Sequence, residues 1–437
     1  MKFNPPKGTI DITGEQFYQY KLVADSILQV LERYGFTQVR TPVFDDFNLL
    51  AKDAGEEVEG QIYRFKDKAG RDLAIKSDIT PALTRLVGKY AKSTIKPIKY
   101  SCYDRVYRYE RPQKGRYREI TQINGEMFGV NSALADMEIL NCLIDCYSEV
   151  GLDDVKIYIG CRPLLELFIK NTIQDESKVK PVIRLLDKVD KISREQFLNE
   201  EKALGITPKM AGSLDKFSDV KGDFSKGIED FEVLVGEDKV YESYLTRLKE
   251  ISRLIDVLGL NKKIKLNLSL ARGSEYYTGI IFEARYESGQ TSSLSIGGGG
   301  RYDNLVKMYG GPDTPAVGFS IGIDRLILLL EEVGMLKKML PVIDYALVYE
   351  NTEKSKSFAV KLADELRKSG FNVDISLSNK NTQEQIENAN AKGVKKIILI
   401  KDNLLKKNNT VLVWRIDKPE EKQEIALGRN LQFRNLI

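Results

Sequence analysis

The sequence predicts a mixed α/β (α+β) protein, with an antiparallel sheet and flanking helices first and a smaller α/β domain last. Strand pairs joined by short turns alternate with amphipathic helices up to about residue 161. Charge-rich helical patterns replace the strands over 162–262, and a βαβαβ alternation begins after residue 344. At 437 residues the chain is also too long for a single core, so two or three domains are expected.

The first part of the chain begins with an amphipathic helix. Residues 15–34 place apolar side chains at helical spacing, and Gly35 is a suitable helix C-cap. Residues 36–44 follow as a strand, in which Pro42 indicates an edge or a bulge. A hairpin is expected around Ala69-Gly70. The same patterns predict helices over 81–92 and 134–150 and strands over 98–109, 117–129 and 154–160.

The charged segment 162–262 is interpreted as an inserted helical domain. Its clearest helices are expected over 176–202 and 238–257. Strand character returns at 264–272 and 277–286, and 317–336 runs from strand into helix. A linker is expected at 334–344. After it come strands at 345–350, 371–377 and 395–400 and helices at 353–369 and 382–392, which predict a parallel or mixed sheet.

Composition excludes several kinds of chemistry. The chain has no histidine, so Ser-His triads, a histidine base and histidine metal ligands are ruled out. Cys142 and Cys146 have i, i+4 spacing, which could suggest a metal pair. Without a CxxC motif, buried reduced thiols are favoured for all four cysteines, and no metal site is expected. The chain has no run of about 18 apolar residues and no signal-peptide core at its start. We therefore expect no membrane association and a cytoplasmic location.

The strongest chemical signal is the cationic hairpin over 107–122. Net charge is only +4, so any basic surface must be local. This stretch carries several arginines and a lysine between two predicted strands, with a Pro-Gln-Lys-Gly turn in the middle. Side chains two residues apart share a strand face, which pairs Arg108 with Glu110 and Gln122 with Glu126. A solvated charged hairpin is the alternative interpretation, but guanidinium groups on a sheet face form a rigid receptor for phosphate or carboxylate.

Two further motifs follow along the chain. Arg272 at a strand end precedes the paired Tyr276 and Tyr277, which could also be an interfacial tyrosine pair. The run GGGGRYD (297–303) allows close backbone approach to a ligand, but it fits neither the Rossmann nor the P-loop pattern. Arg325 falls in the first turn of an apolar helix, where a cation is unfavourable unless it faces a bound polyphosphate.

These motifs together resemble the histidyl-tRNA synthetases, a family of class II aminoacyl-tRNA synthetases. ERPQKGRYRE (110–119) resembles motif 2, GIDRL (322–326) resembles motif 3, and the first helix with GFTQVRTPVF (35–44) resembles motif 1. RGSEYYTG (272–279) is similar to the family's histidine-specific RGLDYYTG. The resemblance covers essentially the whole chain. It implies a catalytic domain over 1–161 and 263–335, a helical insertion over 162–262, an anticodon-binding domain over 342–437, and a homodimer formed through motif 1.

The resemblance also implies roles for individual residues in binding ATP, which is expected to arrive with Mg²⁺. Arg108 would bind the α-phosphate, Glu110 the adenine end, and Arg116 with Arg325 the outer phosphates and the adenine face. Arg272 would stabilise the α-phosphate while the amino-acid carboxylate attacks it.

Further roles concern L-histidine and the histidine tRNA. Glu126 and Tyr277 would hold the imidazole ring beside Tyr276, with Asp78, Thr80 and Gln122 around the α-amino group. Gln113 and Lys114 are candidates for contact with the tRNA acceptor stem. The chain departs from common family patterns at KSDITP (76–81), at RGSEYY (272–277) and at Ile120-Thr121-Gln122.

Two other functions remain open at this point. A paralogue that charges no tRNA and serves as the regulatory subunit of ATP phosphoribosyltransferase would share much of this pattern. The presence of Arg108, Arg272 and Arg325 and of a C-terminal α/β domain argues against it. A synthetase for glycine, proline or threonine would share motifs 1 to 3 but would not predict Glu126 together with RGSEYYTG.

Overall fold

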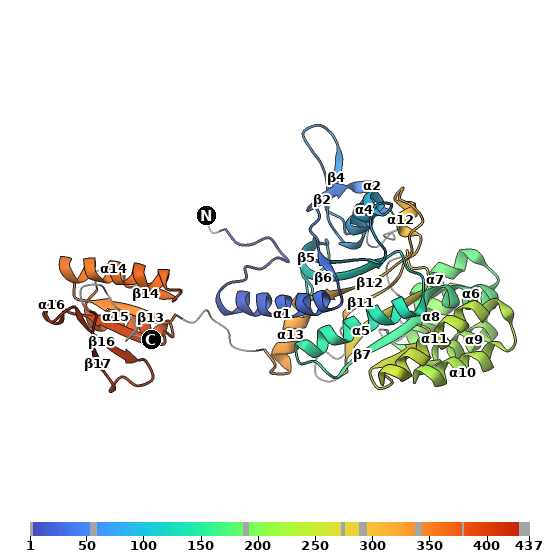
Figure 1. The fold of residues 1–437 in the computed structure, drawn as a ribbon. Coiled ribbons are helices and arrows are strands. Elements are labelled where there is room, and N and C mark those ends of the chain that lie inside the picture. The colour runs from blue at the N-terminus through green and yellow to red at the C-terminus, as the bar shows by residue number, and fades with distance from the viewer. Residues whose placement is uncertain are drawn as a thin grey trace. The chain divides into compact units, whose positions relative to one another are not determined.

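A large twisted sheet of antiparallel strands forms the centre of the first part of the chain (Figure 1). The computed structural model describes residues 3–52, 59–186, 192–271, 276–287, 295–336, 343–377 and 380–427. Within these residues, the sheet has the strand order β1-β5-β6-β12-β11-β10-β7-β9-β8. Its strands are β1 (Thr37–Gln38), β5 (Ile98–Tyr107), β6 (Glu119–Phe128), β7 (Val155–Cys161), β8 (Lys221–Gly222), β9 (Ile264–Asn267), β10 (Ile280–Tyr286), β11 (Ser295–Arg301) and β12 (Ala316–Gly322).

Along the sheet order from β5 to β7, each strand pairs antiparallel with the next, and β8 pairs antiparallel with β9. The pairs β1–β5 and β7–β9 are parallel. This arrangement confirms the antiparallel hairpin predicted for 98–109 and 117–129. Arg108 lies just past the end of β5, and Arg116 precedes β6, so the cationic residues lie at the turn and not within the strands. The strand expected at 264–272 is shorter, because β9 ends at Asn267.

Three helices cover one face of this sheet: α1 (Gly14–Arg33), α5 (Ala133–Glu149) and α13 (Ile323–Glu332). Their apolar stripes share one core with the sheet, to which α1 contributes Ile27 and Leu31 and α13 contributes Leu326 and Leu330. The stripes recur at helical spacing, and this confirms the periodicity seen in the sequence. These three helices do not cover the other face, which is buried only in part by a second core that includes Cys102 and Val106 of β5.

The predicted single strand over 36–44 is wrong. Thr37 and Gln38 form β1 in the large sheet, whereas β2 (Phe44–Asp46) belongs to a separate small sheet with β4 (Asp72–Ile75) and β3 (Arg64–Lys66). Pro42 lies between the two strands and has no N–H for a ladder, so the chain leaves one sheet and enters the other there. Near this small sheet lie α2 (Phe47–Ala51), α4 (Thr80–Tyr90) and α12 (Leu305–Met308).

Among its described residues, the segment 162–262 forms helices and one short strand, β8. Figure 1 shows its helices gathered in one group within the first unit. They are α6 (Arg162–Ile173), α7 (Glu176–Leu186), α8 (Arg194–Ala203), α9 (Pro208–Ser218), α10 (Phe224–Val235), the 3₁₀ helix η1 (Lys239–Tyr241) and α11 (Glu242–Leu258). These helices and the large sheet lie in a single compact unit, Met1–Lys338.

The second compact unit, Met339–Ile437, has its own sheet in the order β14-β13-β15-β16-β17. β13 pairs parallel with β14 and β15, whereas β16 and β17 add antiparallel strands, so the sheet is mixed as predicted. The last two strands were not foreseen. The elements are β13 (Tyr345–Tyr349), α14 (Glu353–Lys368), β14 (Val373–Ile375), α15 (Thr382–Ala391), β15 (Lys396–Ile400), α16 (Asp402–Leu405), β16 (Thr410–Arg415) and β17 (Gln423–Ala426). Of the helices in the described ranges, none combines the length and the hydrophobicity needed to span a bilayer.

Candidate active site

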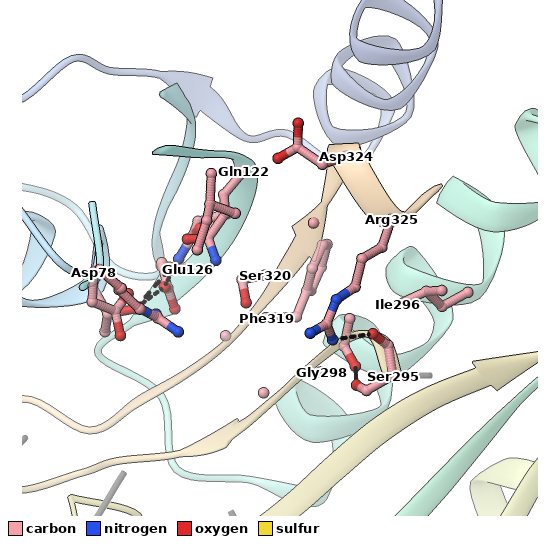
Figure 2. A pocket seen from close by; sticks show the side chains of 18 of the residues that line it. Asp78, Gln122, Glu126, Ser295, Ile296, Gly298, Phe319, Ser320, Asp324 and Arg325 are labelled. Carbon is pink, nitrogen blue, oxygen red and sulfur yellow. Dashed lines mark hydrogen bonds between the residues drawn. The ribbon is translucent and has the colours of Figure 1, made fainter. Parts of the chain in front are cut away.

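A cavity of about 280 Å³ opens on the face of the large sheet between β6, β12 and β11 (Figure 2). Figure 2 shows Asp78, Gln122 and Glu126 on one side of it and Arg325 with Ser295 on the other. The predicted binding residues that line the cavity are Asp78, Thr80, Arg108, Glu110, Arg116, Gln122, Glu126, Tyr276, Tyr277 and Arg325. Arg272 lies outside the described residues. Gln113 and Lys114 are exposed on the turn before β6.

One end of the cavity is cationic. The Nε atom of Arg108 donates to the carbonyl oxygen of Ser77 at 2.8 Å. Arg325 donates to the carbonyl oxygens of Gly115, at 3.2 Å, and Ser295, at 2.8 Å. A carbonyl oxygen orients a guanidinium group without neutralising it, so this charge remains available to an anion.

Arg116 forms an ion pair with Glu110 at the same end. Burial lowers the pKa of Arg325, and the nearby guanidinium groups of Arg116 and Arg108 lower it further. Glu110 opposes this change. Like charges held together in this way are stabilised by a bound polyanion, which also explains the unfavourable place of Arg325 at a helix start.

The opposite end consists of buried polar side chains around the Glu126 carboxylate, and Glu126 is 1% exposed. Its carboxylate accepts hydrogen bonds from Thr80 Oγ1 at 2.7 Å, from Asn124 Nδ2 at 2.9 Å and from the hydroxyl of Tyr302. Burial raises the pKa of Glu126 to about 7, while these three donors act in the opposite direction. We call this group of side chains the acceptor end.

Two amide oxygens at the acceptor end have no hydrogen-bond partner within the described residues. They are Gln122 Oε1 and Asn124 Oδ1, and both side chains line the cavity. The Asp78 carboxylate lies nearby, within 3.4 Å of the Tyr276 hydroxyl. Buried acceptors without donors are costly, so this end is suited to a ligand that brings N–H groups, such as an ammonium or an imidazole.

The glycine run 297–300 forms β11 in the middle of the sheet, where its small residues allow close packing. A Cβ atom at Gly300 would lie 2.8 Å from the ring of Tyr277, and one at Gly299 would lie 1.9 Å from the carbonyl oxygen of Gly318. On the neighbouring β12, a Cβ atom at Gly318 would lie 1.5 Å from Glu126 Oε2. These glycines therefore let the tyrosine and the carboxylate reach their places.

Among the residues that line the site and were given no role from the sequence are Asn124, Tyr302 and Asp324. Asn124 lies between Gln122 and Glu126 at strand alternation, so the spacing of two residues could have identified it. Tyr302 belongs to the GGGGRYD run, but its partner Glu126 is distant in sequence. Asp324 precedes Arg325; it accepts from the Thr121 N–H at 2.7 Å and from the Tyr20 hydroxyl at 3.1 Å. Asp324 thereby joins α13 to β6 and α1.

The antiparallel sheet, with one arginine after β5 and another in the first turn of α13, has the architecture of a class II aminoacyl-tRNA synthetase. The family model for Histidyl-tRNA synthetase matches residues 8–326, and the model for Anticodon binding domain matches residues 345–432. A histidine–tRNA ligase of Pyrococcus furiosus is 34% identical over 428 residues, which cover 98% of this chain and 97% of that protein. The chain belongs to the histidyl-tRNA synthetase family.

Other relatives agree with this membership. A histidine–tRNA ligase of Methanocaldococcus jannaschii is 34% identical and matches over 91% of this chain and 92% of its own. The crystal structure of histidyl-tRNA synthetase from Nostoc has the same fold, with a TM-score of 0.78, 24% identity and coverage of 98% and 97%. A Bacillus halodurans protein described as an ATP phosphoribosyltransferase regulatory subunit/histidyl-tRNA synthetase also shares the fold, with a TM-score of 0.75, 21% identity and coverage of 92% and 99%. At that identity it does not favour the regulatory alternative.

Proposed function

We propose that the protein is a histidine–tRNA ligase. It activates L-histidine with ATP to histidyl-adenylate and then transfers the histidyl group to the 3′ terminal adenosine of histidine tRNA. One observation carries this proposal: a cationic end and an acceptor end face each other across a single cavity, in a chain of the histidyl-tRNA synthetase family. The cationic end is suited to the triphosphate, and the acceptor end is suited to the amino acid.

Adenylate formation at this site uses charge and not a general base. The histidine carboxylate is already ionised and attacks the α-phosphorus, with pyrophosphate leaving. Arg108 holds the α-phosphate, Arg116 and Arg325 hold the outer phosphates and the adenine face, and Glu110 contacts the adenine end. A donor positioned where charge develops contributes roughly 3–4 kcal/mol to the transition state.

Arg272 is proposed to stabilise the α-phosphate as the new bond forms. Mg²⁺ enters as part of the substrate MgATP. Its ligands are then mainly phosphate oxygens and waters, in keeping with how this ion binds nucleotides. The described residues hold no group of three or more His, Cys, Asp or Glu side chains placed for a metal ion.

Histidine is proposed to lie at the acceptor end, with its imidazole between Glu126 and Tyr277 and beside Tyr276. Its ammonium group is proposed to lie against Asp78, Thr80 and the free oxygen of Gln122. An apolar analogue of the same shape would leave these buried groups unpaired, which gives strong discrimination.

Histidine tRNA is proposed to contact Gln113 and Lys114 with its acceptor stem and the domain over 342–437 with its anticodon. Truncation at about residue 340 should therefore reduce tRNA charging far more than histidine-dependent pyrophosphate exchange. Both reactions are to be measured on the same preparation. Equal loss of the two would contradict an anticodon-reading role.

Two copies of the chain are proposed to pair through the motif 1 region. Phe17 on α1 and Phe44 on β2 are 52% and 53% exposed, which is costly for large aromatic side chains unless a second copy covers them. α1 packs against β5 and β6, close to the edge of the sheet at which β1 lies (Figure 1). The helical segment 162–262 is proposed to remain a distinct insertion between the two parts of the catalytic domain, and the protein is proposed to act in the cytoplasm.

The test of function is histidine-dependent ATP–pyrophosphate exchange, followed by charging of histidine tRNA. We expect exchange with histidine and none with glycine, proline or threonine. Exchange with another amino acid, or none with histidine, would refute the proposal. Binding of an ATP phosphoribosyltransferase catalytic subunit without any exchange would instead support the regulatory alternative.

A further inference from the structure

Two arginines from different elements hold one fully buried carboxylate beside the tyrosines of the acceptor end. Asp136 lies in the first turn of α5 and is 0% exposed. Arg301, at the end of β11, donates Nε and Nη2 to Asp136 Oδ1 at 2.8 and 2.6 Å. Arg247, on α11, donates Nε to Oδ2 at 2.8 Å. Each carboxylate oxygen is therefore bound by a different element.

Arg301 connects this carboxylate to the acceptor end of the cavity. Its carbonyl oxygen accepts from the Thr278 N–H at 2.8 Å, directly after the tyrosine pair. Its side chain lies under Gly279, where a Cβ atom would meet the Arg301 stem at 3.1 Å. Tyr302 is the next residue, and its hydroxyl donates to Glu126. A shift of Arg301 would thus move both tyrosine segments.

Arg247 donates hydrogen bonds to two residues near the N-terminus of α5. Besides Asp136, it donates Nη2 to Asn131 Oδ1 at 2.8 Å. Its side chain is 25% exposed, whereas that of Arg301 is 4% exposed. The Arg247 position is therefore open to solvent, and the residue can be replaced while Arg301 remains as a partner for the buried carboxylate.

We propose that Arg247 is a positioning residue for amino-acid recognition. From α11, within the segment 162–262, it fixes Asp136, through Asp136 it fixes Arg301, and through Arg301 it fixes Tyr302 and the tyrosine pair 276–277. The inference rests on the proposed function, and it gives the helical segment a part in binding histidine.

Geometry is the expected contribution of this network, because buried ion pairs add little net stability after desolvation. Without Arg247, Asp136 Oδ2 has no other donor within the described residues. Burial raises the pKa of Asp136, and the two guanidinium groups act against that change. The carboxylate would then turn to share Arg301 or water. The Nε and Nη2 contacts of Arg301 would shift with it, while Nη1 keeps its bonds to Asp303 Oδ1 and to the Val130 carbonyl oxygen.

Replacement of Arg247 is expected to leave the cationic end of the cavity unaffected. Arg108 and Arg325 are oriented by the carbonyl oxygens of Ser77, Gly115 and Ser295, and neither arginine donates to Asp136. Replacement of Arg247 should therefore raise the KM for histidine and leave the KM for ATP nearly unchanged.

The test is steady-state pyrophosphate exchange on the full-length chain with Arg247→Met, which keeps an apolar stem of similar reach. We expect the KM for histidine to rise about tenfold while the KM for ATP changes by less than about twofold. Arg247→Lys keeps the charge but loses one of the two contacts, so it should restore most of the loss and leave about a threefold rise. Lys249→Met is the matched control: Lys249 lies on the same helix, pairs with Glu232 and has no link to Asp136.

An unchanged KM for histidine in folded Arg247→Met, or equal changes for both substrates, overturns the proposal. Should Arg247→Met not fold, Arg247→Lys decides: a rise for histidine alone supports the proposal, and no change overturns it. Exchange by the wild-type chain tests the proposed function separately. Failure of the ligase function would appear there, before any variant is compared.

Discussion

The two ends of the cavity are built in different ways. At the cationic end, Arg108 and Arg325 are held by main-chain carbonyl oxygens, which leave their charge available. At the acceptor end, Glu126 is surrounded by side-chain donors from α4, β6 and the residue after β11. The first end therefore offers charge to a flexible polyanion, and the second offers a fixed pattern of acceptors.

Under the proposed function, this difference separates affinity for ATP from selection of the amino acid. The attraction between phosphate and guanidinium charges falls only as the inverse of their distance, so it tolerates small changes in geometry. Selection of one side chain among twenty depends on buried polar groups that a wrong ligand leaves unpaired. Changes at the two ends should therefore have different kinetic consequences.

The largest effect is expected at the cationic end. Arg325→Ala should lower kcat/KM for pyrophosphate exchange by several hundredfold, because one positioned cation contributes roughly 3–4 kcal/mol. Lys114→Ala, on the exposed turn, is the control and should leave exchange intact. Comparable activity of Arg325→Ala and wild type would show that charge at this end is not used.

The pH dependence of stability should report the acceptor end. In the ligand-free protein the pKa of Glu126 is raised from 4.5 to about 7. Between these values the unfolded chain releases a proton that the folded chain retains, so stability should fall as pH rises from 4.5 to 7, by roughly 3 kcal/mol at most. Glu126→Gln should remove that part of the slope. Denaturant unfolding at several pH values measures the free energy of unfolding of both proteins. The same dependence on pH in wild type and Glu126→Gln would contradict this assignment.

A single methyl group should disturb the same carboxylate. Gly318→Ala places a Cβ atom 1.5 Å from Glu126 Oε2, so the carboxylate or β12 must move. Overpacking of this kind costs about 1–3 kcal/mol of stability, and the KM for histidine should rise with it. In Gly322→Ala, at the end of the same strand, the added Cβ atom has no other atom within 4 Å, so the melting temperature should equal that of the wild type. Equal melting temperatures for the two variants would refute the close contact.

The smallest expected change is at Asn124. Asn124→Ala removes a donor to Glu126 and an unpaired oxygen together, which should cost about 1 kcal/mol in histidine binding. ATP binding should not change. Titration of both substrates measures the difference, and a shift for ATP alone would place Asn124 at the wrong end of the cavity.

Local patterns in the chain predicted much of the fold. Helical spacing identified α1 and α5, and alternation around the cationic turn identified β5 and β6. The split of 36–44 into two strands was missed, because strand propensity does not say which sheet each residue joins. The two antiparallel strands β16 and β17 were missed for a different reason, because they follow the βαβαβ alternation on which the prediction rested.

The candidate site divides in a similar way. Contiguous motifs and the family resemblance singled out Arg108, Gln122, Glu126 and Arg325, and all four line the cavity. Long-range pairing alone brought Tyr302 to Glu126, Asp324 to Thr121 and Arg247 to Asp136. Periodicity reports which face of an element is buried, but the partner of a buried polar group is chosen only when distant strands and helices pack together.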